Sequence, residues 1–192
     1  MHIVSTIAIL LLGASPAFAH VGHGTTESFA AGIAHPLGGL DHITVMVAVG
    51  LWAALKGGRA LWIWPCAFVG VMLVGGALGM AHVDLPFVEP AILASVVALG
   101  LLVALAVDMP VALGAAIIGA FALFHGHAHG TEVTDSANGL IYMAGFALAT
   151  AALHLAGIGF AQLMARNALR PLVRVAGAVC VVIGGGLIAG VI

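Results

Sequence analysis

The chain of 192 residues is 63% hydrophobic and only 6% charged, with a net charge of −2 and a mean hydropathy of +1.25. Soluble globular domains carry about a quarter charged residues, so this composition indicates an integral membrane protein. No basic excess exists to favour a nucleic-acid partner. The two cysteines, Cys66 and Cys180, lie in separate apolar runs without a C-x-x-C spacing, which argues against a disulfide or a thiolate metal site.

Residues 1–19 have the features of a secretory signal peptide. A short apolar core runs from Ile3 to Leu12, and Ala17-Phe18-Ala19 fits the small-x-small pattern at which such peptides are cleaved. We therefore expect the mature chain to begin at His20. The alternative is that the segment is retained as an additional helix. Both alternatives place residue 20 outside the cytoplasm.

The remainder, residues 20–192, is expected to form a single membrane-embedded domain. A spanning helix needs about 20 predominantly apolar residues, and the connections between the apolar runs are too short for any extramembrane domain. The predicted fold is all-α, a polytopic transmembrane bundle of six helices. The expected spans are 36–55, 60–80, 90–107, 111–131, 139–164 and 172–191. The third of these is short, and the start of the first is ambiguous because Gly38-Gly39 weakens a helix there.

The positive charges predict the orientation of this bundle. All of them fall in or beside the connections at 56–59, 108–110 and 165–171, and Lys and Arg accumulate in cytoplasmic loops. We expect a multi-pass protein of the bacterial inner membrane with a periplasmic mature N-terminus. Most histidines and acidic residues then gather at or near the outer face, and only His154 lies deep within a span.

A histidine-rich motif ends the predicted span 111–131. His125, His129 and Glu132 are spaced i, i+4, i+7, so a helix that continues through them places all three on one face. His127 would point elsewhere. Glycines at G-x-x-x-G spacing, Gly126 with Gly130 and Gly75 with Gly79, would admit a neighbouring helix. The alternative is a histidine-rich loop that binds metal adventitiously.

A second motif begins the first span. His35 and His42 are seven residues apart, two turns along one helix face, and Pro36 is tolerated in a first helical turn. Asp41 is a candidate metal ligand or an acceptor that orients an imidazole. It is also a candidate for a simple helix cap.

Two further polar residues have competing interpretations. Glu89 precedes Pro90 at the start of the third span, where it is either a secondary ligand or an acid favoured by the helix dipole. His154 is either a relay for a transported ion or a buried histidine with satisfied hydrogen bonds. Polar residues within membrane spans point by default to a substrate or ion path.

The two histidine motifs resemble the signatures of the HupE/UreJ family, hydrogenase and urease accessory proteins proposed to be nickel permeases. Residues 35–42 match H-P-x-x-G-x-D-H, and residues 124–132 match F-H-G-x-A-H-G-x-E. The resemblance implies Ni²⁺ as cargo, with Co²⁺ as a substrate in relatives, and no permanently bound cofactor. The expected metal-binding residues are His35, Asp41, His42, His129 and Glu132, with His125 and Glu89.

Two other classes of function compete with a permease as interpretations of the sequence. A membrane enzyme is disfavoured because the chain lacks G-x-S-x-G and H-E-x-x-H motifs, and Ser95 is the only mid-span serine. A non-transporting metal-binding or sensory subunit, including a haem protein, stays open. No nucleotide-binding loop occurs, so the chain itself does not use ATP. A homo-oligomer is compatible with the sequence.

Overall fold

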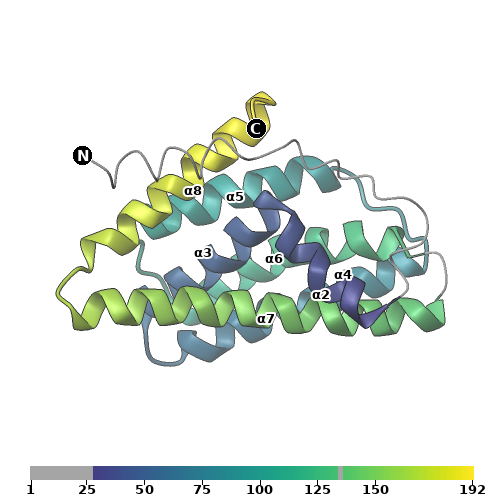
Figure 1. The fold of residues 1–192 in the computed structure, drawn as a ribbon, viewed down its shortest axis with the longest axis horizontal. Helices are drawn as coiled ribbons and strands as arrows, with labels where there is room; N and C mark the ends of the chain where they lie inside the picture. Colours follow the sequence, from purple (N-terminus) through teal and green to yellow (C-terminus); the bar gives the residue numbers. More distant parts are fainter. Residues whose placement is uncertain (1–27, 134–135) are drawn as a thin grey trace, which may run out of the picture.

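The computed structural model describes residues 28–133 and 136–192, so the signal-like segment, His20 and His23 lie outside the described residues. The described residues are all-helical, without strands, and seven helices run through them (Figure 1). In chain order these are α2 (Phe29–Gly38), α3 (Leu40–Lys56), α4 (Ala60–Met80), α5 (Val88–Ala104), α6 (Val111–Thr131), α7 (Ser136–Arg166) and α8 (Pro171–Ala189).

The helices form a multi-pass membrane bundle, which confirms the predicted fold class. Within the described ranges, α4, α6, α7 and α8 are each long and apolar enough to cross a bilayer, and α2 with α3 forms a bent pair that is either a broken span or a re-entrant loop. The apolar helix α5 has 17 residues, which at about 1.5 Å per residue falls somewhat short of a 30 Å hydrocarbon core. The predicted number of six spans is therefore approximate.

The first predicted span, 36–55, is wrong as a single helix. The chain leaves the helix at Gly39, whose backbone is extended (φ −101°, ψ 124°), and α2 and α3 meet at 86°. Ser28 begins α2 by accepting a hydrogen bond from the backbone N–H of Ala31. Pro36 consequently lies in the last turn of α2 rather than in a first turn. Its ring removes a backbone donor, and the two glycines that follow disfavour continuation of the helix.

Parallel helices α4 and α6 are in backbone contact through glycine. A Cβ atom at Gly75 would collide with the carbonyl of Leu123, and one at Gly126 would collide with the carbonyl of Met72. Gly79 and Gly130 continue the same seam by one turn. Small residues four apart allow this close approach in lipid, so the interface uses both predicted G-x-x-x-G pairs.

Helix α7 is crossed in the same way by α2 and α3. Gly32 of α2 lies against the backbone of Tyr142, and Gly145 of α7 lies against that of Phe29. Farther along α7, Gly157 meets the carbonyl of Val47, and Gly50 of α3 meets that of His154. These contacts hold the motif-bearing helices α2 and α3 on one side of α7.

The two ends of the bundle differ in chemistry. The end where α3 begins and α4 and α6 finish, called here the site end, carries the histidine motifs. At the opposite end the rings of Trp52 and Trp64 lie 4.2 Å apart. Their indole N–H groups donate to the carbonyls of Val107 and Val111, each at 2.9 Å, and so anchor the chain between α5 and α6. All lysines and arginines also lie toward this opposite end.

Substitution of Gly75 by alanine is expected to destabilise the bundle. The added methyl group has no room against α6, and overpacking of this kind costs about 1–3 kcal/mol. Gly70 of the same helix is exposed with no atom near its would-be Cβ, so Gly70→Ala is the matched control. Thermal unfolding in detergent is expected to show a lower Tm for Gly75→Ala alone. Equal Tm values for the two variants would contradict the close α4–α6 contact.

Candidate metal-binding site

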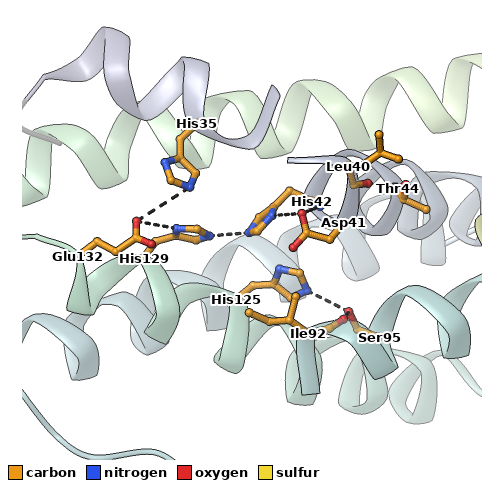
Figure 2. Close-up of polar contacts among 10 residues, drawn as sticks. All are labelled: His35, Leu40, Asp41, His42, Thr44, Ile92, Ser95, His125, His129 and Glu132. Carbon is orange, nitrogen blue, oxygen red and sulfur yellow. Dashed lines mark hydrogen bonds and ion pairs between the residues drawn. The ribbon is translucent and has the colours of Figure 1, made fainter. Parts of the chain in front are cut away.

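The site end brings six of the seven predicted site residues together. Helix α2 contributes one, the start of α3 two, and the end of α6 with the residue that follows it three (Figure 2). We call this group the histidine cluster, and its members are His35, Asp41, His42, His125, His129 and Glu132. The ring of His42 lies 4.6 Å from that of His129 and 5.1 Å from that of His125, measured between centroids.

His35 and His42 meet by a different route from the one predicted. The bend at Gly39 places them on separate helices, so they do not share one helical face as expected. Their rings nevertheless lie 6.1 Å apart, because α2 folds back over the start of α3. A Cβ atom at Gly39 would lie 2.7 Å from Asp41 Oδ1 and 2.9 Å from His42 Nδ1. The missing side chain therefore leaves room for this carboxylate–imidazole pair.

The partly exposed mouth of the cluster consists of His35, His129 and Glu132. One ligand atom from each lies within 4.8 Å of the others. Glu132 Oε2 is 3.4 Å from His129 Nδ1 and 4.0 Å from His35 Nε2. The side chains of Glu132 and His35 are 46% and 35% exposed, whereas that of His129 is 4% exposed. Two imidazoles and a carboxylate at this spacing are ligands that suit a borderline divalent cation.

Asp41 orients His42. Its Oδ1 atom accepts the His42 Nδ1–H at 2.7 Å and the His42 backbone N–H at 2.8 Å. Because this bond assigns the proton to Nδ1, the lone pair of His42 Nε2 points away from Asp41 and toward His129, 2.5 Å from its Nε2. Among the predicted roles of Asp41, this geometry favours an acceptor that holds an imidazole ligand in place.

The contacts that link Asp41 to Glu132 through two imidazoles form a chain that lacks one proton (Figure 2). Three contacts join the four groups, and each needs a hydrogen or a cation between its two heteroatoms. Two neutral imidazoles supply two N–H groups, and ionised carboxylates supply none. An added proton or a metal ion completes the chain.

Ser95 fixes His125 in the deepest part of the cluster. The Ser95 hydroxyl donates to the carbonyl of Ile92 at 2.6 Å, so its oxygen is left to accept the His125 Nε2–H at 3.0 Å. The lone pair of His125 is thereby on Nδ1, which is buried with no hydrogen-bond partner among the described residues. A serine nucleophile would need the reverse arrangement, in which the hydroxyl donates to the imidazole.

The remaining predicted residues lie apart from the cluster. His127 Nε2 donates to the carbonyl of Val83 at 2.7 Å, so this side chain points elsewhere, as the spacing predicts. Glu89 is exposed in the first turn of α5, and the described residues show no hydrogen bond or ion pair between it and the cluster. Its role as a ligand stays a prediction.

Aromatic residues of α7 complete the wall of the site, and the sequence interpretation missed them. The ring of Phe146 lies 4.6 Å from that of His129, and the ring of Tyr142 lies 6.0 Å from that of His35. Both aromatic side chains are buried. Their i, i+4 spacing indicates one helix face, but apolar residues at helical spacing are too common in this chain to single out these two.

Taken together, the fold and the site define a multi-pass membrane protein with a half-buried cluster of imidazoles and carboxylates suited to a divalent cation. The chain belongs to the HupE/UreJ family: the family described as HupE / UreJ protein matches residues 8–187. It is 48% identical to Protein HupE of Rhizobium leguminosarum bv. viciae over 189 residues, which covers 98% of this chain and 97% of that protein. No solved structure matches the chain significantly.

Substitution of Asp41 by asparagine is expected to weaken Ni²⁺ binding by about 10–100-fold, the usual effect of removing a carboxylate that orients a ligand histidine. Asp84, an exposed loop acid, provides a control for loss of negative charge through Asp84→Asn. Calorimetric titration of the purified proteins compares the affinities. Equal weakening in both variants would mean that Asp41 acts through charge alone.

Proposed function

We propose that this protein is a permease that carries Ni²⁺, or Co²⁺, from the periplasm across the inner membrane to supply nickel enzymes such as hydrogenase or urease. The observation that carries the proposal is the grouping of His35, His129 and Glu132, whose ligand atoms lie within 4.8 Å of one another. These residues adjoin the contact chain from Asp41 to Glu132, which an added proton or a metal ion would complete. Imidazole with carboxylate suits nickel, cobalt, zinc and copper. The motif resemblance to proposed nickel permeases favours nickel among these.

The position of the cluster supports transport over storage. Its mouth is partly exposed at Glu132, and His42 and His125 lead from there into the buried bundle. A permeant ion must bind well enough to enter and weakly enough to leave. Two of the mouth residues, His35 and Glu132, are partly exposed, so water can compete for their ligand atoms, which is compatible with release. A static binding or sensory subunit is the alternative that an uptake measurement decides.

An enzymatic function receives little support. Ser95, the mid-span serine, donates its hydroxyl proton to the backbone carbonyl of Ile92. His125 donates to that serine rather than accepting from it. We therefore assign Ser95 the task of orienting an imidazole.

Charge asymmetry supports the proposed orientation of the site in the membrane. Lys56, Arg59 and the arginines around the α7–α8 connection all lie at the end of the bundle opposite the cluster. Because positive residues favour the cytoplasmic side, we infer that the site end faces the periplasm. The cluster would then receive the cation from outside.

Uptake is expected to depend on His129 and not on His127, its neighbour in the same motif. His129→Gln removes an imidazole of the cluster, whereas His127→Gln keeps an amide N–H positioned to donate to Val83. Radioactive nickel uptake at submicromolar concentration, measured in nickel-transport-deficient cells at matched membrane levels, is expected to fall to background only for His129→Gln.

Competition by cobalt and zinc in the same uptake assay ranks the substrates. Wild-type cells that take up no more nickel than cells with an empty vector, despite correct insertion of the protein, would overturn the permease proposal. Retained nickel binding by the purified protein in that case would favour the binding or sensory alternative.

The orientation is tested by labelling single cysteines in a background where Cys66 and Cys180 are replaced by alanine. Asp84→Cys lies at the site end and Ala168→Cys in the α7–α8 connection, and both positions are exposed. A membrane-impermeant maleimide is expected to label only Asp84→Cys in intact spheroplasts and both variants after lysis. The reverse pattern in intact spheroplasts would mean that the site end faces the cytoplasm, opposite to the proposed orientation.

A further inference from the structure

His154 is a buried imidazole that the histidine cluster does not use. It lies within α7, and its side chain is fully buried. Its Nδ1–H donates to the carbonyl of Met46 at 2.7 Å, so the lone pair is on Nε2. That atom has no hydrogen-bond partner among the described residues. Buried polar groups normally have partners, and each exception calls for an explanation.

The position of His154 is held by backbone contact rather than by chance packing. Gly50 and Gly157 bring α3 and α7 so close that a Cβ atom on either would collide with the other backbone. This close crossing keeps His154 next to the Met46 carbonyl of α3, to which it donates. The free Nε2 is consequently a fixed feature of the bundle interior.

The ring of Phe68 is a neighbour of both His154 and the deepest histidine of the cluster. The ring of Phe68 lies 5.7 Å from that of His125 and 5.0 Å from that of His154. His125 Nδ1, on the cluster side, is likewise buried and unpartnered within the described ranges. Each of these two imidazoles therefore has one nitrogen without a partner among the described residues, and both rings lie beside the buried Phe68 side chain.

A thioether, which is a softer ligand than imidazole, lies one turn from these groups. Thr150 precedes His154 by four residues on α7, and its hydroxyl donates to the sulfur of Met72 at 3.7 Å. Met72 in turn follows Phe68 by four residues on α4. Residues four apart share a helix face, so a hydroxyl and a thioether lie on the faces that carry the two rings. Imidazole and thioether are ligands that borderline and soft cations accept.

We propose that His154 Nε2 is a second, inner metal-binding site, which receives the cation from His125 once the Phe68 ring has moved aside. This inference rests on the proposed function, because an inner site is useful only to an ion that passes through the bundle. The proposal assigns a role to His154, the mid-span histidine, and extends the path beyond the cluster toward the opposite end. His154 acts by direct coordination, with Met46 fixing its tautomer.

Two substitutions separate coordination from packing. His154→Asn places an amide N–H near the position of Nδ1, so it can keep the hydrogen bond to Met46 while removing the Nε2 lone pair. His154→Gln places a weakly coordinating amide near the position of Nε2. The two variants, the wild-type protein, His129→Gln and His127→Gln are purified separately. Each protein is then reconstituted into liposomes that contain a nickel-sensitive dye.

Both His154 variants are expected to bind Ni²⁺ at the cluster within about twofold of the wild-type affinity, yet to lose about tenfold or more in uptake, as for loss of a group that supports metal binding. His129→Gln loses binding and uptake together, and His127→Gln loses neither. If the wild-type protein takes up nickel and either His154 variant takes up as much, the inner site is overturned and the permease proposal stands. Parallel loss of binding and uptake in both His154 variants would also overturn it, by giving His154 a structural role. Absence of wild-type uptake would instead overturn the proposed function.

Discussion

Backbone contact through glycine is the constraint on which the rest of the bundle depends. Between membrane helices there is no hydrophobic driving force, so association relies on close packing. The contacts of Gly75 and Gly126 join α4 to α6, and those of Gly32 and Gly50 join α2 and α3 to α7. Each crossing lies within a few residues of a histidine. The same approach that holds the helices together therefore sets the distances between imidazoles.

Orientation of the imidazoles follows a shared rule. His42, His125 and His154 each donate one ring N–H to a fixed acceptor, respectively a carboxylate, a hydroxyl and a backbone carbonyl. Each is thereby left with one lone pair of defined direction. Such partners fix the tautomer and the ring plane of a ligand. Asp41 and Ser95 are as much part of the site as the histidines they orient.

The helices of the fold were readily predicted from the sequence, and the contacts of the site only in part. Residues 60–80 and 111–131 match α4 and α6 because an uninterrupted apolar run has one stable form in lipid. The glycines at 38 and 39 made the start of the first span ambiguous, but the 86° bend escaped prediction because hydropathy carries no angle. Helical spacing correctly separated His127 from His129. The partnership of Ser95 with His125 depends on how α5 meets α6, which no spacing along the chain encodes.

Solvent exposure is high at the mouth residues Glu132 and His35, low at His129 and His42, and zero at the fully buried His125. In the proposed permease, a cation on this line would exchange its water molecules for protein ligands in stages. Mg²⁺ holds its water tightly and prefers oxygen, so it gains little from an imidazole. The gradient would then make the proposed path a dehydration filter, which favours nitrogen-binding ions over hard ions.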